Sequence, residues 1–300
     1  MKRRSERVSP KTALVAWIDI LGLSAELQNA RTTRDFARAH KKVHFVQRCL
    51  EHPPTTDNPK NTRWLQGRFR EYIIALSDGL VLAQVFDTPR TFYPFDLAME
   101  FIEKLLNAQA ECVINGYFLR GAVTMGTFYF KNDILLSPAL VAAYKLETER
   151  SYYPVIIINR ELVANLRRLP GHENHPFDWS ICHFRPFKSP RQKSGERFDH
   201  LHYLGYLVTN PNVPHVFSDQ ELDRALGEKL PPTVEGHRDI YKSRRREVMK
   251  LMATHKKCLL QAYAASSTDR VRAKYRWLFK YHNRLIDRLP TDFRDHVINF

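Results

Sequence analysis

The sequence predicts an α+β fold, followed by a pair of helices at the C-terminal end. Three observations support this: a buried strand-like run at residues 13–19, a strand pair with a tight turn at residues 72–86, and helical apolar stripes from about residue 239 onward. The chain has 300 residues, of which 43% are hydrophobic and 26% charged. This composition is typical of a globular protein with a large core.

The first elements follow from local patterns. Residues 13–19 are apolar enough for a buried strand, and the polar run at residues 32–35 starts a helix. Residues 51–63 are rich in Pro, Asn, Thr and Asp, which predicts a loop. Strands at 72–76 and 80–86 form a hairpin with residues 77–79 at its tip, where Gly79 suits a tight turn.

The next elements complete a sheet. The patterns predict a helix at 95–108, strands at 112–118 and 120–130, a helix at 138–149 and a strand at 153–158. The resulting order, β-α-β-β-α-β-β-α-β, suits an antiparallel sheet with helices on one face. We therefore expect a ferredoxin-like palm.

The sequence divides into three predicted parts. Residues 10–165 form the palm, which would be the catalytic domain. Residues 166–238 are polar and Pro-rich with one strand-like run at 201–208, and are expected to extend that domain. Residues 239–300 form a helical hairpin whose turn and N-cap lie at 266–269.

Two aspartates end apolar strand-like runs: Asp19 follows residues 13–18 and Asp78 follows residues 73–76. Carboxylates are rare at such positions unless something compensates their charge, and a divalent cation held by oxygen ligands would do so. Arg120 is a lone cation on a third apolar strand. A metal site beside a guanidinium indicates a phosphate ligand.

These segments resemble, in order, the three motifs of the class III nucleotidyl cyclases, which read Phe-x-Asp-Ile-x-Gly-Phe-Thr, Gly-Asp and Arg-x-Gly-x-x-x-Gly. The resemblance implies a class III type palm and cyclisation of a nucleoside triphosphate with two Mg²⁺ or Mn²⁺ ions. It implies that Asp19 and Asp78 bridge both ions and that Arg120 contacts the triphosphate. It also implies that the carbonyl of Ile20 coordinates metal and that three amides cradle the phosphates, those of Gly22, Leu23 and Ser24.

Tyr72 bears on which base the substrate carries. Purine cyclases carry Lys or Glu six residues before the second aspartate, where this chain has Tyr72. A bulkier, uncharged side chain narrows the pocket and favours a pyrimidine. The second base-reading position falls on Ile134 or on Asp133. Together with the segment 137–147, these features resemble the pyrimidine cyclases of the bacterial anti-phage system Pycsar, which implies UTP or CTP as substrate, a cyclic monophosphate as product and a separate effector protein that reads it.

One departure from the family keeps alternatives open. Purine cyclases use an Asn and, four residues later, an Arg, where this chain has Val141 and Lys145. Lys145 can supply charge as a catalytic residue, but Val141 cannot hydrogen-bond. The alternatives are an adenylate or guanylate cyclase, or an inactive homologue that binds nucleotide. The resemblance also implies a homodimer with shared active sites.

Net charge, apolar stretches and cysteine spacing limit which partners are expected. The formal net charge is +15, and we interpret the basic residues near the C-terminus as solvated helix surface, so nucleic acid is not expected as a partner. Neither a membrane segment nor a signal peptide is predicted, and the four cysteines form no CxxC pair, which favours the cytoplasm. Zinc binding by the His/Cys residues of segment 172–183 is disfavoured by their irregular spacing.

Overall fold

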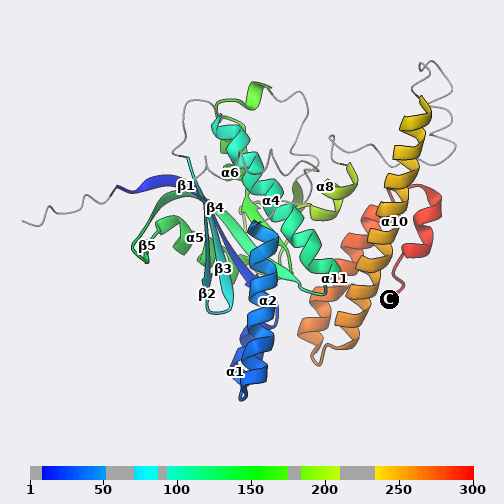
Figure 1. Ribbon diagram of the computed structural model, residues 1–300, viewed down its shortest axis with the longest axis horizontal. Helices are drawn as coiled ribbons and strands as arrows, with labels where there is room; N and C mark the ends of the chain where they lie inside the picture. The colour runs from blue at the N-terminus through cyan, green and yellow to red at the C-terminus, as the bar shows by residue number, and fades with distance from the viewer. Residues whose placement is uncertain (1–8, 52–70, 87–92, 175–183, 210–233) are drawn as a thin grey trace, which may run out of the picture. The chain divides into compact units, whose positions relative to one another are not determined.

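The structure consists of two units. A computed structural model of the chain describes residues 9–51, 71–86, 93–174, 184–209 and 234–300 (Figure 1). The described residues fall into two compact units, with the first built from residues 1–108, 118–176 and 185–201 and the second from residues 109–117, 177–184 and 202–300. The expected three-part division of the chain stays a prediction.

Four antiparallel strands form the centre of the first unit, in the order β2-β3-β1-β4. These strands are β1 (Lys11–Ile20), β2 (Glu71–Leu76), β3 (Gly79–Val85) and β4 (Leu119–Lys131). A helical connection follows β1 and another follows β3, so the arrangement is the split β-α-β of a ferredoxin-like palm. The predicted α+β fold class is confirmed.

Further strands extend this palm. β6 joins β4 in parallel, β8 and β7 follow at the same edge, and β5 pairs with the far end of β4. Their bounds are β5 (Ile134–Leu136), β6 (Ile156–Asn159), β7 (Phe184–Phe187) and β8 (Phe198–Leu201). Asn132 and Asp133 both have positive φ in the turn before β5, as a two-residue hairpin of type I′ requires.

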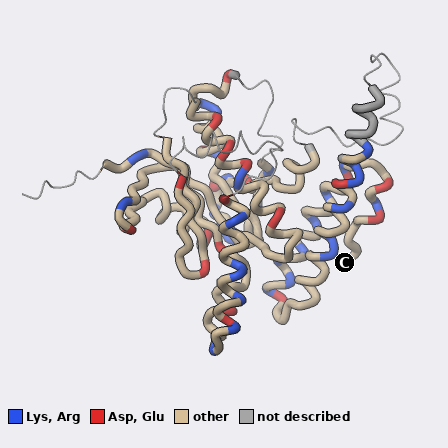
Figure 2. Tube along the Cα trace, in the orientation of Figure 1, with Lys and Arg blue, Asp and Glu red and all other residues tan. Residues whose placement is uncertain are grey.

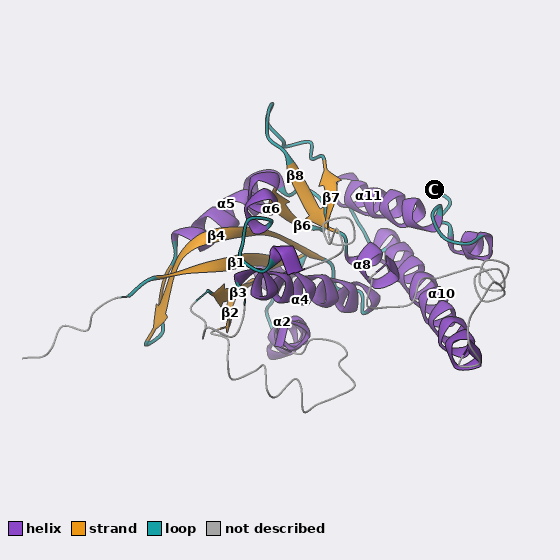
Figure 3. Ribbon diagram, turned by 90° about the horizontal axis from the view of Figure 1, so that it is seen from above, coloured by secondary structure: helices purple, strands orange, loops and turns teal. Residues whose placement is uncertain are grey.

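Helices cover both faces of the sheet. In the first unit they are α1 (Leu23–Asn29), α2 (Thr33–Glu51), α4 (Pro94–Ile114, of which residues up to Ala108 belong here), α5 (Pro138–Arg150) and α6 (Arg160–Leu166), followed by a short 3₁₀ turn (His172–Asn174). Figure 3 shows α5 on one side of the strands and α2 and α4 on the other. The expectation of helices on one face is corrected here: successive residues of β1 and β3 are buried, so both faces need cover.

Two predicted strands are wrong. The segment 112–118 was expected to be a strand, but α4 continues to Ile114 because Cys112 and Val113 extend its buried stripe. Gly116, at φ +80°, then ends the helix: its amide and that of Tyr117 bond back to Val113 and Cys112. In the segment 201–208, β8 ends at Leu201 and a helix begins at Tyr203. The prediction failed here because a continuous apolar run fits a strand or a helix equally well.

The second unit is helical. It contains α8 (Tyr203–Thr209), α10 (Val234–Ala264), α11 (Asp269–Ile286) and a 3₁₀ turn (Thr291–His296). The predicted pair of C-terminal helices and the cap between them are confirmed, since the hydroxyl of Thr268 accepts a hydrogen bond from the Val271 amide at 3.3 Å. Lys and Arg recur along α10 and α11 (Figure 2), and several pair locally, as Arg245 does with Asp292. No helix in the described part of the chain is long and apolar enough to cross a membrane.

Candidate functional site

The ends of β1, β3 and β4 bring the predicted charged residues together. In the register of the sheet, Asp19 lies between Gly79 on β3 and Arg120 on β4. Asp78 directly precedes Gly79, in the turn between β2 and β3. The two aspartates are therefore neighbours at one end of the sheet, and Arg120 is the cross-strand partner of the first.

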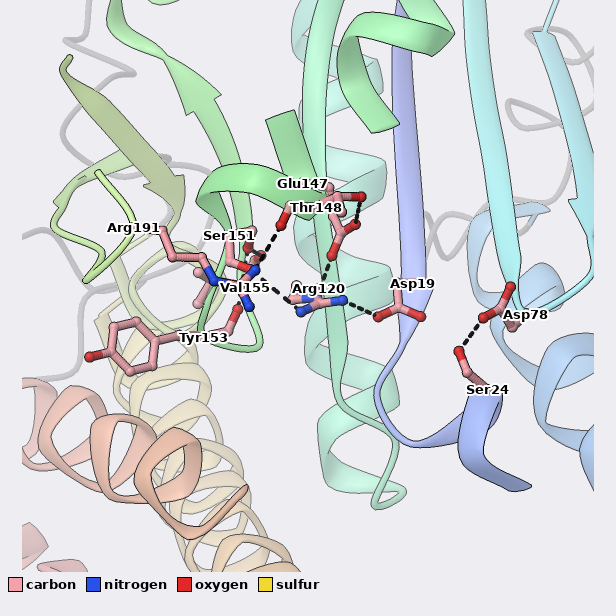
Figure 4. A network of polar contacts seen from close by, with 10 residues as sticks. All are labelled: Asp19, Ser24, Asp78, Arg120, Glu147, Thr148, Ser151, Tyr153, Val155 and Arg191. Carbon is pink, nitrogen blue, oxygen red and sulfur yellow. Dashed lines mark hydrogen bonds and ion pairs between the residues drawn. The ribbon is translucent and has the colours of Figure 1, made fainter. Parts of the chain in front are cut away.

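Arg120 is held by three acceptors (Figure 4). Its Nη2 donates to Oδ2 of Asp19 at 2.9 Å, its Nη1 donates to the carbonyl of Ser151 at 3.5 Å, and its Nε forms an ion pair with Oε1 of Glu147. A guanidinium has donors along two edges and can therefore serve all three groups at once. Ser151 caps the C-terminal end of α5, where the helix dipole also favours a cation.

Glu147 joins this charged group and was not among the residues predicted from the sequence. It occupies the buried stripe of α5 with Ala139 and Ala143, one helical turn apart each, and is only 2% exposed. Burial raises its pKa above the ordinary value, while Arg120 lowers it. Its other oxygen, Oε2, accepts from the Thr148 hydroxyl at 3.1 Å. The available signal was a carboxylate on an alanine-lined, core-facing helix stripe.

Asp78 has a separate partner in the same region. The hydroxyl of Ser24 donates to its Oδ2, which links the start of α1 to the β2–β3 turn (Figure 4). Gly22 precedes α1 with a left-handed φ of +89°, a conformation that favours glycine. The amides of Leu23 and Ser24 lie in the first helical turn, where amides have no partner within the helix.

Two glycines near the aspartates are required by close contacts. A Cβ on Gly79 would lie 2.4 Å from the Trp17 ring, so Gly79 makes room for that ring, while the left-handed turn residue is Ser77 at φ +55°. This corrects the expected turn role of Gly79. A Cβ on Gly121 would lie 2.5 Å from the Trp17 carbonyl. Gly121 follows Arg120 directly, so the third motif matches the family at Arg120 and Gly126 but carries Ala122 at its first glycine.

The predicted base-reading residues lie elsewhere on the sheet. Tyr72 pairs with Ala83, which pairs with Val15, so it is four strand residues, or about 13 Å along the strands, from the level of Asp19. The Tyr72 ring packs against Phe128 and Phe130 with centroids 5.3 and 5.4 Å apart. It is therefore at least a packing residue. Asp133 and Ile134 lie exposed in the β4–β5 hairpin.

Lys145 does not join the charged group in this chain. It is exposed on α5, two residues from Glu147 and thus on the opposite side of the helix. Val141 lies one turn earlier on that exposed face, 53% exposed. Of the disfavoured zinc ligands, His172 contacts the Phe95 ring, and His175, Cys182 and His183 lie outside the described residues.

The donor set fits a divalent cation of the Mg²⁺ type. Two carboxylates at the end of neighbouring strands and the carbonyl of Ile20 are hard oxygen donors. Mg²⁺ in phosphate-handling sites is commonly held by one or two carboxylates, with water and phosphate completing its shell. Among the described residues, no group of three or more His, Cys, Asp and Glu side chains could hold a metal ion. Asp19, Asp78 and the Ile20 carbonyl are thus the donors that would hold such an ion at this end of the sheet.

Comparisons with known proteins give structural neighbours only. The chain is similar to the adenylyl cyclase CyaB from P. aeruginosa, at 11% identity and a TM-score of 0.38 over 65% of this chain and 95% of that one. It is also similar to the dimeric guanylyl cyclase domain of the RhoGC fusion protein from Blastocladiella emersonii, at 13% identity and a TM-score of 0.39 over 65% and 97%. The adenylate/guanylate cyclase/hydrolase from Silicibacter pomeroyi gives 13% and 0.37 over 65% and 98%. No protein-family model matches the sequence, and no curated protein matches it.

Proposed function

We propose that the protein is a pyrimidine nucleotide cyclase that converts UTP or CTP to the 3′,5′-cyclic monophosphate and pyrophosphate. The observation that supports this best is the register that sets Asp19 between Gly79 and Arg120. It gives two carboxylates for divalent cations and one guanidinium for phosphate at the same end of the sheet. This is the charge arrangement that phosphoryl transfer requires.

In the proposed reaction, the 3′-hydroxyl oxygen attacks the α-phosphorus, loses its proton, and displaces pyrophosphate. Asp19 and Asp78, with the carbonyl of Ile20, would hold Mg²⁺ or Mn²⁺, which when bound assists deprotonation of the hydroxyl and polarises the α-phosphate. Arg120 would bind phosphate oxygens, and the amides of Gly22, Leu23 and Ser24 would bind the terminal phosphates. Lys145 would supply charge to a site in a partner subunit.

The choice of a pyrimidine rests on Tyr72, a bulky and uncharged residue where purine cyclases carry Lys or Glu, which would narrow the base pocket. An adenylate or guanylate cyclase is the alternative. The exposed apolar side chains Ile134 and Leu136 on β5 and Val141 on α5 support a homodimer, since a second copy would cover apolar side chains that are otherwise exposed. The anti-phage role, the effector protein and the cytoplasmic location stay predictions.

A nucleotide-binding protein without turnover is the second candidate. It is favoured by Val141, an exposed apolar residue at the position where purine cyclases have a hydrogen-bonding Asn. Such a protein would bind triphosphate and release it unchanged.

Incubation of the purified protein with ATP, GTP, CTP and UTP and Mn²⁺, followed by mass-resolved detection of cyclic monophosphates, tests the proposal. One cyclic pyrimidine product is expected. A cyclic purine product would instead establish the alternative cyclase. Triphosphate binding without any product, by a protein shown to be dimeric, would overturn the proposal in favour of the second candidate.

A further inference from the structure

Arg120 occupies the same carboxylate that the proposed function assigns to a metal ion. Its Nη2 lies 2.9 Å from Oδ2 of Asp19, and the two side chains are 19% and 14% exposed. Opposite charges at this distance and burial attract strongly, because little solvent screens them. A cation that binds Asp19 must therefore compete with Arg120.

Glu147 holds the Arg120 guanidinium in place when the contact between Arg120 and Asp19 is broken. The Glu147 side chain is 3% exposed, and a carboxylate this deeply buried is strongly destabilising without a cation beside it. Arg120 supplies that cation through Nε. Separating Arg120 from Glu147 is therefore much more costly than separating it from the more exposed Asp19.

The three contacts of Arg120 thus differ in how readily another group can replace Arg120 in them. Nε faces the buried Glu147, and Nη1 faces the carbonyl of Ser151 at the end of α5, both of which stay in place (Figure 4). Nη2 faces Asp19, which lies at the part-exposed side of the network. Only this last contact has a substitute, namely a divalent cation on the same oxygen.

Resting on the proposed function, we propose that the Arg120–Glu147 ion pair regulates cation binding at Asp19. Arg120 neutralises Asp19 while no cation is bound, and Glu147 keeps the guanidinium beside the site once a cation has replaced it. Glu147 is then a positioning residue, which acts through Arg120. The Arg120–Glu147 ion pair lowers the affinity of Asp19 for a cation. It also keeps Nη2 of Arg120 available for a phosphate oxygen.

This arrangement predicts effects of opposite sign on cation binding and on turnover. Arg120→Ala removes the competing cation, so Mn²⁺ binds about ten-fold more tightly, while turnover falls. Glu147→Gln removes the charge that draws Arg120 from Asp19, so Mn²⁺ binds more weakly. A residue that only supports the fold would not raise affinity and lower turnover in the same variant.

The test is titration of the full chain with Mn²⁺ alone, followed by electron paramagnetic resonance of the free ion. Because Arg120→Ala leaves Glu147 buried without a cation, the double variant Arg120→Gln/Glu147→Gln is measured as well and is also expected to bind Mn²⁺ more tightly. Arg150→Gln is the matched control, since Arg150 lies on α5 and its ion pairs are with Glu149 and Glu196. Its affinity stays within about two-fold of wild type.

The outcomes separate this inference from the proposed function. Mn²⁺ binding that is lost in Asp78→Asn but unchanged in both Arg120 variants overturns the inference and leaves the metal site standing. Binding that appears only in the Arg120 variants supports the inference. No Mn²⁺ binding in any folded variant overturns both.

Discussion

The two units bury polar side chains in different ways. In the first, Glu147, Arg120 and Asp19 form a chain of charged groups. In the second, Tyr203, His255 and His282 form a chain of neutral groups that are fully buried. A charged chain can exchange one member for another ion of the same sign, whereas a neutral chain resists any added charge. The difference suits the first unit to binding ions and the second to holding a fixed structure.

The hydrogen bonds that link Tyr203, His255 and His282 all run in one direction, from donor to acceptor along the chain. The carbonyl of His296 can only accept, so His282 donates from Nε2 at 2.9 Å. His282 Nδ1 then accepts from Nδ1 of His255, and His255 Nε2 accepts from the Tyr203 hydroxyl, both at 2.9 Å. Every ring nitrogen is satisfied while both histidines are neutral. A proton on either ring would break at least one of these bonds.

The largest effect is expected from removing charge at the first site. Asp19→Asn or Asp78→Asn lowers the rate of cyclic product formation by about 10³-fold or more, because an amide is a poor ligand for Mg²⁺ and Mn²⁺. Circular dichroism of both variants stays that of wild type. Asp269→Asn, at the exposed start of α11, is the matched control and keeps full activity. A fully active Asp19→Asn variant would refute the metal role.

The neutral chain is expected to respond to acid. Burial lowers the pKa of His282 from 6.5 to about 4; the hydrogen bond to the His296 carbonyl opposes this, and the charges of His296 and Lys256 add to it. Burial, with His282 nearby, lowers the pKa of His255. As pH falls from 6.5 to 4, the unfolded chain therefore takes up protons before the folded chain does. The free energy of unfolding falls by about 3 kcal/mol from His282 over this window and is unaffected by it above pH 6.5.

Urea unfolding of the full chain at a series of pH values measures this effect. His282→Leu reduces the slope between pH 6.5 and 4, whatever its stability at neutral pH. His40→Asn, at an exposed histidine of α2, is the control and keeps the wild-type slope. An unchanged slope in His282→Leu would show that the pair is not kept neutral by burial.

A smaller effect is expected from one end of the neutral chain. Tyr203→Phe removes the donor to His255 and leaves a buried ring nitrogen unpaired, which lowers the free energy of unfolding by about 1–3 kcal/mol. Tyr263→Phe is the matched control, because its hydroxyl accepts a hydrogen bond from the exposed Arg276. Its cost is about 0.5 kcal/mol or less. Equal costs in thermal unfolding would contradict a special role for the buried chain.

The smallest effect on stability is expected at Tyr72, where packing and base recognition can be separated. Tyr72→Phe keeps the ring between Phe128 and Phe130, so the melting temperature changes little. If the hydroxyl reads the base, kcat/KM for the preferred pyrimidine falls by about ten-fold while the other triphosphates are unaffected. An unchanged preference among the four triphosphates would leave Tyr72 with a packing role alone.

The sequence predicted the palm well where patterns were long and unambiguous. The strand ending at Asp19 was a continuous apolar run, the hairpin around Asp78 had a turn signal and the C-terminal helices had a helical period, and the structure has all three. The error at 112–118 came from an apolar segment that fits strand or helix, and the glycine that ends α4 was the overlooked signal. Such segments are settled by tertiary packing, which no local pattern contains.

The candidate site was predicted in part. Asp19, Asp78 and Arg120 could be found because each is a charge on or next to an apolar strand, and the structure brings them to one end of the sheet. Glu147 was not found, although its helix was predicted, because its role depends on which side of α5 faces Arg120. The distance of Tyr72 from this group follows from the strand register, which sequence alone does not fix.

The pairing of β1 with β4 also has a consequence for how the protein is made. The contact between Asp19 and Arg120 joins residues 101 positions apart, and Glu147 comes later still. Contacts of such separation form late, because a long loop must close first. A growing chain on the ribosome therefore carries Asp19 without its counter-charge until β4 has emerged, and the network around Arg120 is complete only after α5 follows, when about half of the polypeptide has been synthesised.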